Sequence, residues 1–169
     1  MRFWHLSIAL VLIMGCDRNI DKPDCSKIFS PQDYGKFIVN GTTGIAQHAS
    51  GDVWYRCKAG QSFRGKKCLG DALKLTRREA DSYLRDFSEK SGETWRLPTK
   101  SEFKKILESS CDSPNVNPNV FPGLTTDNYW LQDSSWHGSR FGCSIFLYQG
   151  STSCRQPADL HQYVLIMRD

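Results

Sequence analysis

Six cysteines that follow residue 16 constrain the fold of this 169-residue chain more than any other feature. They are Cys25, Cys57, Cys68, Cys111, Cys143 and Cys154. An even number of cysteines in an exported chain is typical of a disulfide-stapled domain, although six cysteines allow fifteen pairings. The sequence contains no C-x-x-C motif, which argues against a zinc ribbon and against a thioredoxin-type redox site.

The spacing of the cysteines favours two local bridges. One pair flanks the glycine-containing, basic loop 58–67, and another lies symmetrically about the turn at Gln149 and Gly150. The third pair follows by elimination and ties the N-terminal arm to the body. The predicted pairs are therefore Cys57–Cys68, Cys143–Cys154 and Cys25–Cys111.

The first sixteen residues resemble a bacterial export signal that ends in a lipobox. Arg2 precedes an apolar stretch over residues 6–14, and Gly15 stands before Cys16. About nine apolar residues are too few to cross a bilayer, which requires roughly twenty. We therefore expect a signal peptide over residues 1–15, lipidation at Cys16, a tether over 16–35 and one domain over 36–169. A plain secretory signal is the alternative.

The export signal predicts an envelope location and a lipid bilayer as the first partner, reached through the acylated Cys16. Asp17 resembles the inner-membrane retention signal of some enterobacteria, but the rule varies, so inner membrane, outer membrane, periplasm and cell surface stay open. The formal net charge of +4 is too small and too mixed to indicate a nucleic-acid partner.

Sequence patterns predict two helices and several short strands. Thr76 with Glu79, and Thr99 with Glu102, form capping boxes ahead of helically spaced apolar residues. Strands are expected at 37–39, 53–57, 129–131, 141–148 and 163–167, and an ordered loop at 112–128. This order of elements predicts an α+β domain with two helices, a mainly antiparallel sheet and long ordered loops.

Four segments carry a specific family resemblance. They are Ser50-Gly51-Asp52-Val53-Trp54-Tyr55-Arg56-Cys57-Lys58-Ala59-Gly60-Gln61; Trp95-Arg96-Leu97-Pro98-Thr99 with Glu102-Phe103; Cys111-Asp112-Ser113-Pro114-Asn115-Val116-Asn117 leading to Val120-Phe121-Pro122; and Tyr129-Trp130. In this order and spacing they resemble the bacterial Lcl C-terminal domain family, over roughly residues 37–168.

The resemblance implies a C-type lectin-like fold and, from the family's named member, the tip of a collagen-like adhesin, binding to sulfated glycosaminoglycans. Two features depart from the pattern. Leu131-Gln132-Asp133 separates Tyr129-Trp130 from Ser134-Ser135, and the chain has no collagen-like Gly-x-y stretch. Most of the motif residues are explained as structure: Trp54, Trp95, Leu97 and Trp130 as core, and Arg96 as a donor to carbonyls or a carboxylate.

The best candidate binding site is electropositive. Basic residues crowd the Cys57–Cys68 loop and the start of the first helix, and a bridged loop would hold such side chains ready for sulfate, phosphate or carboxylate. The candidate ligand-binding residues are Arg56, Lys58, Arg64, Lys66, Lys67, Arg77 and Arg78.

Motifs for catalysis are missing from the sequence. Neither G-x-S-x-G nor H-E-x-x-H occurs, and His48, His137 and His161 have no Ser or Cys at a telling spacing. The Arg96–Glu102 motif also resembles that of formylglycine-generating enzymes, but the C-terminal Asn-x-x-Glu-Trp segment of those oxidases is not present. We expect a non-enzymatic protein without cofactor or metal.

These observations lead to one hypothesis and one alternative. The first is an envelope lipoprotein whose non-catalytic domain recognises an anionic polysaccharide or another surface component. The alternative is a structural or assembly lipoprotein that docks a protein partner in a pilus or secretion apparatus. A basic surface around the Cys57–Cys68 loop would favour the glycan, and a broad apolar patch the protein partner.

Overall fold

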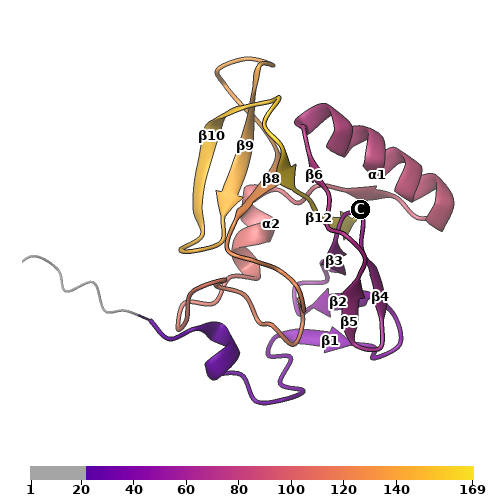
Figure 1. Ribbon diagram of the computed structural model, residues 1–169, viewed down its shortest axis with the longest axis vertical. Coiled ribbons are helices and arrows are strands. Elements are labelled where there is room, and N and C mark those ends of the chain that lie inside the picture. The colour runs from indigo at the N-terminus through magenta and orange to yellow at the C-terminus, as the bar shows by residue number, and fades with distance from the viewer. Residues whose placement is uncertain (1–21) are drawn as a thin grey trace, which may run out of the picture.

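The computed structural model describes residues 22–169 and contains two five-stranded sheets, a two-stranded hairpin and two α-helices (Figure 1). The predicted signal peptide, Cys16 and the first part of the tether lie outside the described residues. The α+β class and the predominance of antiparallel pairing are confirmed, since the β11–β8 pair alone among the named strand pairs is parallel. No helix within residues 22–169 is long and apolar enough to cross a membrane.

The first sheet places the chain's last strand beside its early strands. Its spatial order is β1 (Phe37–Val39), β2 (Ile45–His48), β3 (Val53–Lys58), β12 (Leu165–Arg168) and β7 (Trp95–Arg96). The second sheet has the order β10 (Ser151–Pro157), β9 (Phe141–Phe146), β8 (Asn128–Ser134), β11 (Gln162–Tyr163) and β6 (Lys74–Leu75). The hairpin consists of β4 (Ser62–Arg64) and β5 (Lys67–Leu69), outside both sheets.

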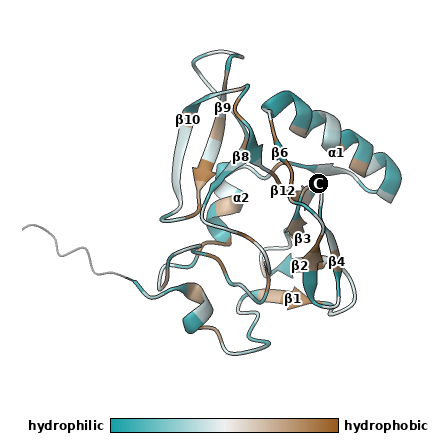
Figure 2. Ribbon diagram, in the orientation of Figure 1, coloured by the Kyte–Doolittle hydropathy of each residue, from teal (hydrophilic) through white to brown (hydrophobic). Residues whose placement is uncertain are grey.

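Both predicted helices begin at their capping boxes. Helix α1 (Arg77–Ser91) has Thr76 at its N-cap and ends at Gly92, whose φ of 71° suits glycine. Helix α2 (Lys100–Lys105) has Thr99 at its N-cap. A single 3₁₀ turn, η1 (Cys25–Lys27), precedes them. Most of α1 is hydrophilic, as expected for a helix that packs on the body by one face (Figure 2).

Four of the five strand predictions are confirmed in place, and the fifth is divided between two strands. Residues 163–167 were expected to form one strand, but the chain leaves the second sheet after Tyr163 and enters the first sheet at Leu165. The strand predictions also left out β2, β4, β5, β6, β7 and β10. Strand β10 is rich in serine and carries no apolar alternation, so its pairing with β9 depends on the tertiary structure.

The core consists of two clusters of buried side chains. The larger one joins the two sheets and α2, with Trp54 packed edge-on against Phe103 and Phe121 at centroid distances of 5.9 and 6.1 Å. The smaller one lies under α1 and contains Leu84, Trp95 and Trp130, among others. The indole of Trp130 donates to the carbonyl oxygen of Leu75 at 2.7 Å, which satisfies its buried N–H.

All three predicted disulfides are confirmed. Cys25–Cys111 spans 86 residues, whereas the other two bridges each span 11. In the chain-entropy model a closure of the longer kind stabilises by about 4.5 kcal/mol and a short one by about 3 kcal/mol. The long bridge therefore contributes most to fixing the N-terminal arm.

The described part of the predicted tether is bound to the body from Pro23 onward. The amide of Asp112 donates to the carbonyl of Pro23 at 3.0 Å, and that of Cys25 donates to the carbonyl of Asp112 at 3.1 Å. The side-chain amide of Asn117 donates to the carbonyl of Asp33 at 3.0 Å. The ordered body therefore starts about a dozen residues before the predicted boundary at residue 36, and the loop 112–128 is ordered as predicted because it receives this arm.

Candidate functional site

The β4–β5 hairpin is the element that presents the predicted basic loop. Its turn residues Gly65 and Lys66 have φ values of 57° and 65°, so both adopt the left-handed conformation that a tight two-residue hairpin turn requires. Phe63 pairs with Cys68, and Arg64 with Lys67. The Cys57–Cys68 bridge ties the hairpin to β3, which compensates for its lying outside both large sheets.

Three cations occupy the tip of this hairpin. The side chains of Arg64, Lys66 and Lys67 belong to exposed residues, and none of them forms an ion pair with a carboxylate within residues 22–169. We call these three residues the hairpin cations. Their charges are therefore accessible to solvent.

Arg56 was predicted to join this group, and that prediction is wrong. The residue is 2% exposed, and its guanidinium donates to the carbonyl oxygens of Val120 at 2.8 Å and Asn119 at 2.7 Å. It also lies 4.2 Å from the centroid of the Phe63 ring. Burial lowers the pKa of Arg56. Because β3 is covered on the side that carries Arg56, this cation holds the 112–128 loop and does not reach solvent.

The prediction that Lys58 binds a ligand is also wrong, because this residue is buried as well. It is 4% exposed, and its Nζ lies 3.3 Å from the hydroxyl of Thr125 and 4.1 Å from the centroid of the Tyr163 ring. Burial lowers the pKa of Lys58, although Asp127 opposes that shift. Arg56 and Lys58 therefore belong to the interior of the domain.

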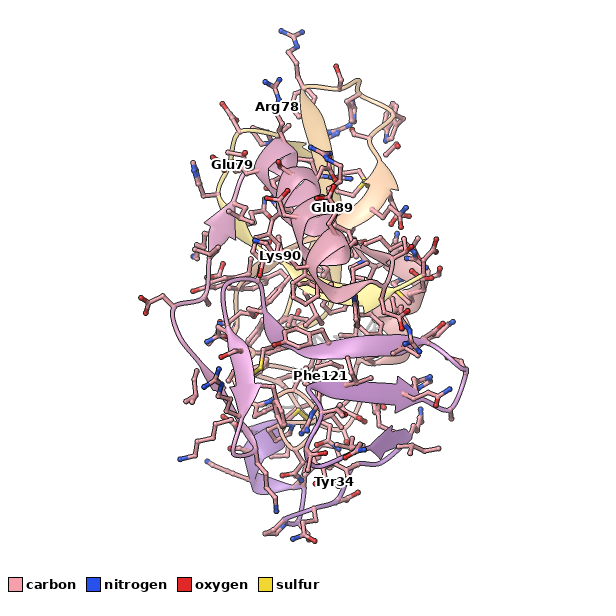
Figure 3. The ribbon with its side chains drawn as sticks, turned by 90° about the vertical axis from the view of Figure 1, so that its right-hand side faces the viewer. Tyr34, Arg78, Glu79, Glu89, Lys90 and Phe121 are labelled. Carbon is pink, nitrogen blue, oxygen red and sulfur yellow. A yellow bond between two sulfur atoms is a disulfide. The ribbon has the colours of Figure 1, made fainter. Side chains whose placement is uncertain are left out.

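The two arginines at the start of α1 remain near the surface but lie apart from the hairpin. Arg78 is exposed, whereas Arg77 is half-buried and ion-paired with Asp81. The base of the hairpin contacts α1 further along, where Tyr83 accepts from the amide of Gly60 at 2.9 Å. Figure 3 shows Arg78 at the end of α1 remote from strands β1–β3. The predicted single cluster is therefore divided between two places.

A cleft that sequence reasoning missed runs along α1. Its main part has a volume of about 530 Å³ between α1, β7 and β8, and a neighbouring part of about 400 Å³ reaches the β8–β9 loop. Arg77, Asp81 and Gln132 line both parts. One signal was present: Arg77, Asp81, Arg85 and Glu89 follow one another at intervals of four residues, which places them on one face of the helix.

The floor of this cleft contains a structural ion-pair network centred on Arg96. Its guanidinium donates to both carboxylate oxygens of Glu102 at 2.8 and 2.9 Å, and to Asp169 at 2.8 Å. These bonds raise the pKa of Arg96 and, together with donation from Thr99, lower the pKa of Glu102 to about 2. The predicted role of Arg96 as a donor to a carboxylate is confirmed. Since its charge is already matched, the cleft offers little net charge to a ligand.

The oxygen-bearing side chains near β8 have separate partners. Asp127 pairs with Lys74 at 2.7 Å, and Asp133 accepts from the amide of Lys100 at 2.6 Å at the start of α2. Within residues 22–169 no group of three His, Cys, Asp or Glu side chains is placed to hold a metal ion.

The comparisons with known proteins agree with the motifs. The sequence model of the Lcl C-terminal domain matches residues 44–168. No curated protein and no solved structure matches the chain. The matched segment includes both helices and all strands from β2 onward, among them the β4–β5 hairpin. The chain belongs to the Lcl C-terminal domain family.

Proposed function

We propose that this protein is a bacterial envelope lipoprotein, anchored through an acylated Cys16, whose non-catalytic domain binds an anionic glycan. Its family membership and the export signal in its sequence support an envelope role. Three disulfides fit an oxidising compartment, since cytosolic chains rarely retain them. The C-type lectin-like fold that the family implies stays a prediction.

The observation that carries the glycan proposal is the set of hairpin cations. They project from a short turn whose backbone is fixed by strand pairing and whose base is fixed by a disulfide. A rigid turn loses little conformational entropy when its side chains bind sulfate or carboxylate groups. No acidic residue stands between Cys57 and Cys68, so the turn attracts anions without internal competition.

A protein partner is the second candidate, and two leucines favour it. Leu69 at the base of the hairpin is 48% exposed, and Leu73 is 39% exposed. Two side chains supply a small apolar area compared with a typical interface, which buries about 800 Å² on each partner. Leu69→Ser combined with Leu73→Ser should abolish a protein contact at this place while leaving glycan binding intact.

The test uses the full-length chain purified in detergent and immobilised heparin as the probe. We expect the wild type to be retained, and Arg64→Gln/Lys66→Gln/Lys67→Gln to elute at much lower salt. Arg78→Gln/Lys90→Gln, which removes two exposed charges from α1, serves as the matched control and should elute close to the wild type. Equal retention of the triple variant and the wild type would refute the hairpin as the binding site.

The anchor is tested separately. Labelled palmitate should be incorporated into the wild type and not into Cys16→Ser. Labelling of both chains, or of neither, would contradict lipidation at Cys16.

A further inference from the structure

The most exposed large apolar side chain of the described residues is Trp136, at 80%. It belongs to the loop that joins β8 to β9, which projects at the top of the molecule in Figure 1. The first described residues lie at the opposite, lower end in the same view. The loop therefore lies away from the N-terminal arm, which carries the predicted anchor.

Two neighbouring side chains lie close to the indole. The ring of His137 lies 3.8 Å from it, centroid to centroid, and the Arg155 guanidinium lies 5.8 Å away on strand β10. Arg155 also donates to Nε2 of His137 at 2.8 Å. The loop itself is fixed because the Ser135 hydroxyl donates to the carbonyl of Cys154 at 2.5 Å, next to the Cys143–Cys154 bridge. Trp136 is therefore a preorganised platform, which reduces the entropy lost on binding.

The surroundings of Trp136 are polar. Within residues 133–142 it is the one exposed large apolar side chain, so it does not belong to an apolar patch of the kind that protein interfaces bury. The end of β8 supplies Asp133 and Ser134 to the 400 Å³ part of the cleft, and the loop supplies Ser135 and Ser139. Arg140 and Arg155 are exposed cations close to the platform in sequence or in space.

An exposed aromatic ring with an arginine beside it suits a sugar ring that has an apolar C–H face and a polar, anionic rim. A pyranose with a carboxylate meets that description. We propose that Trp136 is a stacking platform for a uronic-acid unit of a polysaccharide, with Arg155 paired to its carboxylate. This inference rests on the proposed function, since it takes an anionic glycan as the ligand, and it adds a second contact site and a sugar class.

The probe is a hyaluronan hexasaccharide, which alternates uronic acid with an amino sugar and carries no sulfate, and the protein is the full-length chain in detergent. The indole N–H signals of ¹⁵N-labelled protein report the site directly. We expect the Trp136 signal to shift on titration, and Trp136→Ala to weaken binding at least about tenfold. Trp136→Phe should retain part of the affinity. Because the side chain is so exposed, both variants should keep the wild-type unfolding midpoint.

The matched control separates this site from the hairpin. Arg64→Gln/Lys66→Gln/Lys67→Gln should bind the hexasaccharide as the wild type does, even though it loses retention on heparin. Arg155→Met should weaken hyaluronan binding about fivefold but not the binding of neutral chitohexaose. The inference is overturned if the hexasaccharide does not bind the wild type, if the Trp136 signal does not move, or if Trp136→Ala binds as tightly as the wild type. None of these results would contradict the proposal that the hairpin cations retain the protein on heparin.

Discussion

The cations of β3 and those of the β4–β5 hairpin come from one basic segment of the sequence and have opposite fates. Trp54, Arg56 and Lys58 occupy every second position of β3. The two cations therefore share the face of the tryptophan, and both are buried. Arg64, Lys66 and Lys67, only a few residues later, are exposed and unpaired within the described part of the chain. The difference shows that position in the sheet, and not local charge density, decides whether a basic residue is structural or available to a ligand.

The largest expected effect is at Arg56. Arg56→Met leaves the carbonyls of Val120 and Asn119 without their donor, and should reduce the free energy of unfolding by about 3 kcal/mol in chemical denaturation. Arg64→Met, a change of the same type on the hairpin, should reduce it by less than about 0.5 kcal/mol. Similar losses of unfolding free energy in the two variants would contradict the distinction between a structural Arg56 and a free Arg64.

Glu102 gives the next largest effect and carries a pH signature. Its folded pKa of about 2 lies below the ordinary value of 4.5, so the stabilisation is complete above pH 4.5 and is lost as the pH falls from 4.5 toward 2. Glu102→Gln should reduce the free energy of unfolding by about 2 kcal/mol at pH 7, after allowance for partial exposure, and should flatten the acid dependence in that window. If the free energy of unfolding of Glu102→Gln depended on acid pH as that of the wild type does, the ion pair with Arg96 would not be the cause of this dependence.

Lys58 sharpens the distinction between the two buried cations. Its single hydroxyl partner matches a buried charge poorly, and its pKa is lowered from 10.5. Because the folded state binds that proton more weakly, the stability of the wild type should rise as the pH increases from the lowered pKa toward 10.5. Lys58→Met should be neutral or stabilise the domain by up to about 1 kcal/mol at pH 7 in thermal denaturation. A loss of more than about 2 kcal/mol would make Lys58 as indispensable as Arg56.

Removal of the hairpin charges should affect stability least. Arg64→Gln/Lys66→Gln/Lys67→Gln should change the free energy of unfolding by less than about 0.5 kcal/mol, because exposed and unpaired side chains contribute little. Its circular dichroism spectrum and unfolding midpoint should match those of the wild type. Destabilisation comparable to that of Arg56→Met would mean that these cations also serve the fold.

Local signals in the sequence predicted much of the fold. Both capping boxes, the three disulfides and the buried tryptophans depend on short-range patterns or on a count of cysteines, and all are confirmed. The passage of the chain from one sheet to the other after Tyr163 could not be predicted, because apolar residues continue through this point. Strand β10 was missed because its pairing partner, and not its own composition, determines its structure.

The candidate site was predicted only in part, for a reason visible in β3. Trp54, Arg56 and Lys58 stand at every second position, so the two cations share the face of a buried tryptophan, and this pattern was the signal that they are internal. The cleft along α1 and the Trp136 platform depend on how distant elements pack. Apart from the four-residue spacing on α1, no local sequence motif indicates the cleft or the platform.

The salt dependence of heparin binding tests the central claim most directly, namely that the hairpin cations, and not the buried cations of β3, bind the anionic ligand. With three contacts, the affinity of the wild type should fall by about 30-fold between about 50 and 200 mM salt, by analogy with counterion release from other polyanions. The triple glutamine variant should bind weakly and show almost no salt dependence. A variant whose affinity and salt slope equal those of the wild type would contradict the account.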